Sequence, residues 1–423
     1  MRRTLPARAK PRSTVRRARF PLTATLLATL LPALPAQALA QATPPAPTTT
    51  PAADPAAASG DTLTEAGQSH EKTSFFDRFR DEEDGKLDFS NVLAKGGFIP
   101  VPIVITEPAV DGGYGLMAQF ITMPKDNPAA VTRRMVGAAK TGNGSYGYGY
   151  LQQGSALDQR LHYRFGAGRG KAILTMYPAL LPSGFEYTNK YDYAVLASAR
   201  MDIGKSGFSI GPMLDFRQMR SRIDFAKVPD ELEEQSQRKL NLGALGGGAH
   251  FDNRDNPLAP TKGVNAYVQG RFYADFLGSD RKFQRYEGHA YAFHPLGDGW
   301  RLGAKVEIDA ARGNYPAFIA PSISLRGVQA ARYQGGTVLS TEAELTYQLA
   351  PRWSVLAFGG MGATDPGHSR IFDSSGAIFA GGGGLRYRIA RKLGMDAGLD
   401  VAYGPGGAVF YIQLGQAWSF GMD

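Results

Sequence analysis

A stretch in the C-terminal half of the chain holds residue types that could form ion pairs inside a protein. It reads LRGVQAARY and contains two arginines separated by five residues. Guanidinium is planar and permanently charged, so it pairs with a carboxylate through two hydrogen bonds at once, which lysine does less well. The stretch is either a latch that belongs to a larger structure or a solvated surface loop. The candidate latch residues are Leu325, Arg326, Gly327, Val328, Arg332 and Tyr333.

Other candidate chemistry lacks the spacing that it requires. GAGRGKA (166–172) superficially resembles a phosphate loop, but no Ser or Thr follows Lys171. The acidic run DEEDGKLD (81–88) lacks the spacing of an EF-hand loop, so we interpret it as a solvated charge run. The six histidines form no metal-spaced set, and no Ser-His-Asp context or nucleophile elbow occurs. The sequence therefore predicts no enzyme, no metal site and no cofactor.

The elements that would position the arginines alternate with a period of two. In GWRLGAKVEIDAAR (299–312), the even positions from 300 to 310 are apolar and most odd positions are charged. A soluble β-sandwich alternates too, but its strands are typically about 5–6 residues long. These runs hold 9–14 residues, and their polar face carries both signs of charge. Both features favour a membrane-spanning barrel with a polar interior.

The predicted fold is an all-β, transmembrane antiparallel barrel of about sixteen strands. The arginine stretch lies between strands eleven and twelve, on the outer side, because short connections such as TGNGS and GAGRGK are expected to face the periplasm. The strands are predicted at 113–122, 131–139, 145–152, 158–166, 171–178, 187–201, 206–219, 239–252, 263–274, 283–294, 299–312, 334–349, 352–362, 376–389, 393–403 and 407–420.

The N-terminal region divides into three parts before the barrel. Residues 1–40 have a basic start, an apolar run and small residues near Ala40, which is typical of a cleaved secretory signal peptide. A membrane anchor is the alternative, but the run is too short to span a bilayer. Residues 41–70 form a Pro/Ala/Thr-rich disordered linker. Residues 71–112 are a short periplasmic lead-in or plug, and 113–423 form the barrel.

The basic charge of the chain belongs to the leader. Eight of the 47 basic residues lie in 1–40, where no acid occurs, and the other 39 nearly balance the 38 acids. A nucleic-acid partner is therefore not predicted. Outer-membrane lipids and lipopolysaccharide are the expected partners, and basic residues near strand ends, in RRMVGAAK and around SRIDF, would contact their phosphates; the alternative, which we prefer for these cations, is that they are solvated.

Three motifs resemble one known family. They are FDNRDNPLAPTKG (251–263), the LRGV stretch with the strand after it, and GGGGLRYRIARKLGMDAGLDVAYG (381–404). Together they resemble the bacterial surface antigen family, which belongs to the superfamily of the BamA and TamA assembly barrels and the two-partner-secretion transporters. The resemblance implies a sixteen-stranded outer-membrane barrel whose arginine loop folds back into the lumen and meets carboxylates there. By inward parity, the candidate carboxylates are Glu342, Glu344, Asp396 and Asp400, with Arg386 and Arg388 as competitors.

The sequence departs from this family at three places. Gly360 stands where secretion-type relatives have an acid, and Val328 stands where the loop motif has an aromatic residue. Both departures affect the expected partners of Arg326. The resemblance also implies periplasmic polypeptide-transport-associated domains for assembly and secretion members, but no such domain fits between residues 41 and 98.

The function that the resemblance implies is action on the membrane through a weak barrel seam. The seam is expected between strand 113–122 and strand 407–420, at Gly113, Gly115, Gly415, Trp418 and Phe420. Lipids or nascent barrels are the expected substrates, and the barrel-assembly machinery is a further candidate partner. The alternatives are a structural barrel without transport activity and a passive pore lined by Arg271, Arg285, Glu287, Arg301, Lys305, Glu307 and Asp309.

Overall fold

The structure is a computed structural model that describes residues 79–81, 83–90, 97–122, 132–177, 184–224, 238–256, 259–365 and 376–418. The predicted signal peptide (1–40) and linker (41–70) lie outside the described residues, as does Phe420. Within the described ranges, no helix has both the length and the apolar character that crossing a membrane requires.

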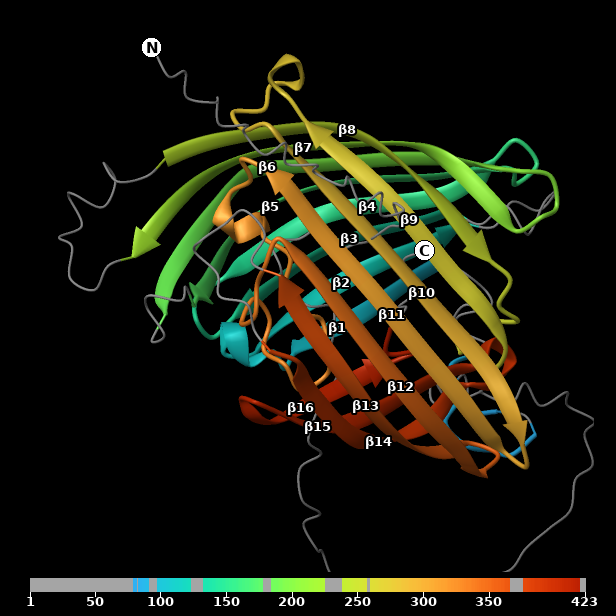
Figure 1. The fold of residues 1–423 in the computed structure, drawn as a ribbon. Coiled ribbons are helices and arrows are strands. Elements are labelled where there is room, and N and C mark those ends of the chain that lie inside the picture. Colours follow the sequence, from blue (N-terminus) through green and yellow to red (C-terminus); the bar gives the residue numbers. More distant parts are fainter. Residues whose placement is uncertain are drawn as a thin grey trace, which may run out of the picture.

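Sixteen strands form one antiparallel sheet in which the strands pair in chain order. Figure 1 shows the sheet curving from cyan β1 round to red β16, so that the barrel is nearly closed. The predicted fold class is confirmed. The strands are β1 (Gly97–Ile105), β2 (Gly113–Thr122), β3 (Thr132–Thr141), β4 (Tyr146–Ala156), β5 (Leu161–Met176), β6 (Phe185–Asp202), β7 (Phe208–Asp224), β8 (Arg238–Asp252), β9 (Gly263–Tyr273), β10 (Phe283–Gly297), β11 (Trp300–Gly313), β12 (Thr337–Ala350), β13 (Trp353–Asp365), β14 (Ile378–Ala390), β15 (Met395–Gly404) and β16 (Gly407–Leu414).

Side chains alternate between the interior and the exterior of the barrel, as β12 illustrates. Glu342 and Glu344 point inward and are only 4% and 2% exposed. Leu339 and Leu345, on the opposite face of the same strand, are 37% and 38% exposed. On this strand the outer face is therefore apolar and suits lipid, whereas the two carboxylates lie in the lumen.

The two ends of the barrel differ in their connections. At the terminal end, where β1 begins and β16 stops, only two residues join β10 to β11 and two join β12 to β13. At the opposite end, the loop end, residues 314–336 connect β11 to β12 and include the short helix η4 (Ala317–Ile319). Ile319 packs into an apolar cluster with Met219 and Tyr273, so this connection forms part of the interior.

The first strand begins earlier than the sequence predicted. Residues 97–105, expected in the lead-in or plug (71–112), form β1, which pairs with β2 along its whole length. That boundary was wrong because Pro100 and Pro102 argue against a strand. Proline is tolerated at a sheet edge, and β1 is an edge strand.

Residues 161–176 form one strand, β5, where two strands and a turn at GAGRGK were predicted. The glycines that suggested a turn instead allow β4 and β5 to approach each other. Gly149 pairs with Gly168, and a Cβ atom added to Gly168 would lie 2.9 Å from the carbonyl oxygen of Tyr148. The TGNGS connection is also reassigned, because it lies at the loop end rather than on the periplasmic side.

The last strand ends at Leu414, not at residue 420 as predicted. Gly415 has a φ angle of +71°, in the left-handed region that favours glycine. Its N–H donates to the carbonyl oxygen of Asp396 at 2.6 Å. The chain therefore leaves the sheet at Gly415, and Trp418 reaches the lumen wall, where its ring lies near Tyr291 and Phe293.

Candidate functional site

The connection between β11 and β12, residues 314–336, is named the arginine loop, and its central part is a hairpin inside the barrel. Ser322 forms an antiparallel bridge with Gln334, and the N–H of Ile323 donates to the carbonyl oxygen of Tyr333 at 3.0 Å. The tip, residues 325–328, is buried. Of the six candidate latch residues, four therefore form the buried tip, and Arg332 and Tyr333 lie on the returning arm.

Arg326 binds three carboxylates from two separate strands. Its Nε and Nη2 donate to Glu342 Oε1 at 2.9 and 2.7 Å, and Nη2 also donates to Glu344 Oε2 at 2.8 Å. Its Nη1 donates to Asp400 Oδ2 on β15 at 2.8 Å. The guanidinium carbon lies 3.6 Å from the ring centre of Phe358, a cation–π contact. One planar fork therefore joins β12, β13 and β15 from within.

Two further side chains share these carboxylates. Trp418 Nε1 donates to Glu342 Oε1 at 2.6 Å, so the C-terminal segment and the arginine loop contact the same oxygen atom. Arg386 donates to both oxygens of Asp400, at 2.5 and 3.0 Å. Because two arginines and an indole N–H surround the carboxylates, each buried charge has a close partner.

The fourth candidate carboxylate, Asp396, is not brought to Arg326. It accepts from Arg388 Nε at 2.9 Å, and Arg388 lies directly opposite Asp396 in the ladder between β14 and β15. Of the remaining latch residues, Arg332 stacks on the ring of Tyr177 at 3.7 Å. Tyr333 packs beside Val328 in an apolar cluster.

The two sequence departures in this region have a steric explanation. A Cβ atom added to Gly360 would lie 2.9 Å from Leu325 Cδ2, and one added to Gly362 would collide with Ile323. The loop therefore packs where a larger side chain on β13 would stand. Val328 is 6% exposed and fills an apolar cluster together with Leu325. Arg326 obtains its acids from β12 and β15 instead of β13.

The arginine loop also contacts both sides of the gap between the first and last strands. The N–H of Gly327 donates to the hydroxyl of Tyr411 on β16 at 2.9 Å. The N–H of Ala330 donates to Glu107 Oε1, in the turn after β1, at 3.2 Å. In Figure 1 the orange loop accordingly descends beside the cyan turn that follows β1. In the described strands β1 and β16 are the two unpaired ends of the sheet order, so this loop bridges an unsealed seam.

The free edge of β1 is poor in hydrogen-bond donors. Along a strand, the N–H groups of alternate residues point to the same side. Because proline has no N–H, Pro100 and Pro102 suit the positions that face away from β2. In this register only Phe98 and Val104 remain as donors toward the seam. An edge with two donors missing pairs weakly with β16.

The predicted seam residues do not all lie at the seam. Gly113 and Gly115 are on β2, where they pair with both β1 and β3, so that assignment was wrong. It followed from the missed first strand. Gly415 and Trp418 lie after the end of β16 and turn into the lumen. Sequence reasoning missed Glu107 and Tyr411, although the two nearby prolines are a readable signal of an edge strand.

Comparisons with known proteins identify the barrel. Residues 141–315 match the Omp85 superfamily domain. Residues 141–315 are an Omp85 superfamily domain. This match confirms the predicted resemblance at the level of the superfamily and indicates the bacterial outer membrane. Omp85 barrels are not enzymes, which agrees with the sequence prediction.

Solved Omp85-type barrels have a similar fold. BamA from Haemophilus ducreyi lacking POTRA domains 1–3 superposes with a TM-score of 0.53 at 12% identity, over 76% of this chain and 70% of that one. CdiB from Acinetobacter baumannii gives 0.53 at 12% identity, covering 75% and 59%. CdiB from Escherichia coli gives 0.54 at 11% identity, covering 74% and 61%. The chain thus spans about three fifths of each CdiB chain. No curated protein matches.

A second charged site lies at the terminal end of the barrel. Residues 79–81 and 83–90, named the N-terminal strap, bind two turns of the barrel. Arg352, between β12 and β13, pairs with Asp81, Asp84 and Asp88 at 2.5, 2.5 and 2.9 Å. Arg391, between β14 and β15, pairs with Asp81 at 2.8 Å. The acidic run is therefore an anchor, and its interpretation as a solvated charge run was wrong.

Charged residues also line the lumen wall formed by β7 and β9 to β11, and they are largely paired with one another. Arg271 pairs with Glu287 and, at 2.9 Å, with Asp215. Arg285 pairs with Asp309 at 2.5 Å. Among the other residues that were predicted to line a pore, Arg301 donates to the carbonyl oxygen of Pro260, and Lys305 pairs with Glu307. The pairs Arg271–Glu287 and Arg285–Asp309 connect neighbouring strands of this wall.

Proposed function

We propose that this barrel acts on the outer membrane by opening laterally between β1 and β16. The observation that carries the proposal is the unsealed seam, which two hydrogen bonds from the arginine loop bridge, one to Tyr411 and one to Glu107. Each such bond contributes about 0.5–1.5 kcal/mol to stability. Parting the seam therefore costs far less than parting any fully paired neighbouring strands.

An open seam would expose two strand edges to the bilayer. Unpaired edges are templates for an added strand, and they also disturb the packing of nearby lipid. Outer-membrane lipids and nascent barrels are the substrates that we propose. A contact with the barrel-assembly machinery stays a prediction. A structural barrel without transport activity and a passive pore are the competing functions. The arginine loop inside the lumen argues against free diffusion through a pore, and its contacts with both sides of the seam argue against a barrel with only a structural role.

A chemical cross-link across the seam tests lateral opening. The chain has no cysteine, so Val104→Cys on β1 with Ala408→Cys on β16 gives one pair for a bis-maleimide reagent. We expect the linked protein in liposomes to lose its acceleration of lipid transfer between leaflets and of insertion of an unfolded barrel. Each single-cysteine variant, treated alike, is the control. Full activity of the linked protein would refute the proposal.

A second variant tests the same seam without a cross-link. Replacing Pro100 and Pro102 by valine gives the free edge of β1 two more donors, so pairing with β16 should strengthen and both activities should slow. Pro212→Val on β7, away from the seam, is the control. Equal rates for the seam variant and this control would argue against opening at β1.

A further inference from the structure

A row of basic residues crosses the outer wall of the barrel near its loop end. The ladders pair Lys140 with Tyr146, Tyr146 with Lys171, Lys171 with Lys190, Lys190 with Arg220, and Arg220 with Lys239. One register line therefore runs across six strands, β3 to β8. The basic row is defined as Lys140, Lys171, Lys190, Arg220 and Lys239.

The basic row faces away from the lumen. Its members are exposed or half-exposed, whereas the next residues along their strands, such as Thr141, Ala172 and Asn189, are buried. In an even-stranded bacterial barrel, the longer loops face outward and the short turns face the periplasm. The basic row thus lies at the level of the outer leaflet. Since neighbouring strands are about 4.8 Å apart, it spans roughly 24 Å.

Few acids offset this charge. Asp192, at the bulge of β6, pairs with Arg220 at 2.6 Å. No carboxylate of the described residues forms an ion pair with the four lysines of the row, Lys140, Lys171, Lys190 and Lys239. The row therefore keeps a clear positive excess, which attracts an anion.

An apolar hollow lies directly toward the membrane centre from the row. It has a volume of about 660 Å³ on the outside of β2 to β6. Its floor consists of small residues, including Ala138, Gly149, Ala167 and Gly168. Ala138 is two residues from Lys140, so the same outward face that carries the basic row continues into the hollow.

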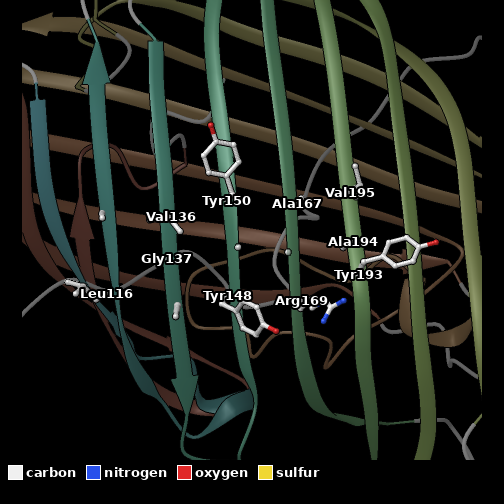
Figure 2. A pocket seen from close by; sticks show the side chains of 14 residues that line it. Leu116, Val136, Gly137, Tyr148, Tyr150, Ala167, Arg169, Tyr193, Ala194 and Val195 are labelled. Atoms are coloured by element: carbon white, nitrogen blue, oxygen red, sulfur yellow. The ribbon is translucent and has the colours of Figure 1, made fainter.

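The rim of the hollow combines aromatic rings with one cation. Figure 2 shows the side chains of Tyr148, Tyr150 and Tyr193 standing around the small residues, with Arg169 beside Tyr148. Tyr148 and Arg169 are paired in the ladder between β4 and β5. Arginine on the lipid-facing wall is unfavourable toward the bilayer centre, and a phosphate group would offset this by accepting its hydrogen bonds.

We propose that this surface binds a phosphorylated, multiply acylated lipid of the outer leaflet, of the lipid A class. The basic row would bind the phosphates, and the small-residue floor would receive acyl chains between the tyrosines. The width of the row suits a headgroup with more than one phosphate better than a narrow, singly charged phospholipid. This binding site lies apart from the seam, and it does not depend on lateral opening.

The test measures lipid A bound to the full chain in detergent, by native mass spectrometry over a series of lipid A concentrations. Lys171→Gln with Lys190→Gln removes two adjacent members of the row. Each basic residue near an anionic membrane surface contributes about 1 kcal/mol, so removing two should lower the affinity roughly thirtyfold. Lys205→Gln with Lys262→Gln, two exposed lysines at the terminal end, should leave it unchanged.

Two further measurements separate charge from acyl-chain binding. Ala138→Phe fills the hollow and keeps every cation, and it should also weaken lipid A binding. Dephosphorylated lipid A should bind the unmodified protein weakly, and phosphatidylglycerol should compete poorly. The proposal is overturned if the lysine pair behaves like its control, if Ala138→Phe has no effect, or if phosphatidylglycerol binds as tightly as lipid A. Heat-modifiable gel mobility verifies that each variant folds. If the variant with Lys171→Gln and Lys190→Gln does not fold, Lys140→Gln with Lys239→Gln replaces it in the same measurement.

Discussion

At the scale of single residues, Arg326 unites parts of the barrel that no backbone ladder joins. It connects a loop tip to β12 and to β15, two strands that are not neighbours in the sheet. Its position over Phe358 and its several donors use the whole planar fork. A lysine at this position would keep the charge but not this geometry.

Replacing Arg326 should therefore destabilise the barrel. Arg326→Ala removes the guanidinium that binds the buried carboxylates of Glu342 and Glu344 and leaves Asp400 with Arg386 alone among its described partners. Removing one partner of a buried ion pair typically costs about 3–5 kcal/mol. Arg326→Lys should cost less. The measurement is the temperature at which the heat-modifiable band unfolds. Arg281→Ala, at a half-exposed loop position that binds no carboxylate in the described structure, should change little. If Arg326→Ala matched that control, the latch would be refuted.

The carboxylates around Arg326 show what inward parity predicts and what it omits. Parity correctly placed Glu342, Glu344 and Asp400 on the lumen face. It does not distinguish Asp396, because the choice depends on the residue across the ladder. Asp396 faces Arg388, whereas Asp400 faces Gly384, which leaves its carboxylate free to meet two arginines. Strand register, and not residue type alone, decides the partners.

At the scale of elements, ion pairs attach the N-terminal strap to two turns of the barrel. Burial raises the pKa of Asp88, but hydrogen bonds from Ser90, the Arg391 backbone and Arg352 outweigh it and lower the pKa to about 2. Hydrogen bonds and charge from Arg391 and Arg352 likewise lower the pKa values of Glu83 and Asp84. Because the pKa of these carboxyls is lower in the attached strap than in the detached one, attachment is fully stabilised when the pH lies above the ordinary carboxyl pKa. This stabilisation is lost as the pH falls through the lowered pKa.

The strap should therefore stay bound at neutral pH and detach in acid. A spin label on Leu87→Cys, whose side chain is 51% exposed, reports its mobility. We expect an immobile label at pH 7 and increasing mobility as the pH falls from about 4 toward 2. With Arg352→Gln the label should already move at pH 7. A label that stays immobile in acid, or in the arginine variant, would contradict this account of the attachment.

The strand count shows how element-scale errors can cancel. The prediction missed β1 because of its prolines and split β5 into two strands because of its glycines. The two errors cancel in the count, so the sequence still predicted sixteen strands. From β6 onward the two errors compensate, and the predicted orientation of each strand agrees with the structure. For β2, β3, β4 and the first half of β5 the predicted directions were reversed. Proline and glycine were interpreted by their local preferences, whereas their positions at a free edge and at a close strand contact decided the structure.

At the scale of the whole molecule, the lumen holds both the arginine loop and the C-terminal segment. Ile319, Leu325 and Val328 of the loop are buried against the wall, and Trp418 contacts Glu342 from another direction. Charged side chains on the remaining wall mostly pair with one another. An interior filled in this way favours a barrel that works at its wall over one that conducts through its centre.

Planar-bilayer recordings should distinguish these two modes. We expect little steady current from the intact protein and a clear steady current when residues 322–334 are replaced by a short Gly-Ser linker, because the hairpin no longer occupies the lumen. Removing the same number of residues between β7 and β8 should not raise the current. A steady current from the intact protein equal to that of the loop variant would favour a passive pore.

The strap also limits how the two edges could separate. Its last residue, Ser90, accepts a hydrogen bond from the N–H of Lys392 beside β15, and β1 begins at Gly97. Seven residue steps cover at most about 25 Å when fully extended. At the periplasmic rim a short covalent connection therefore limits how far the edges can separate, whereas in the described residues only the hydrogen bonds of the arginine loop hold them from the opposite end. Such a gap widens as a wedge, with its mouth toward the outer leaflet.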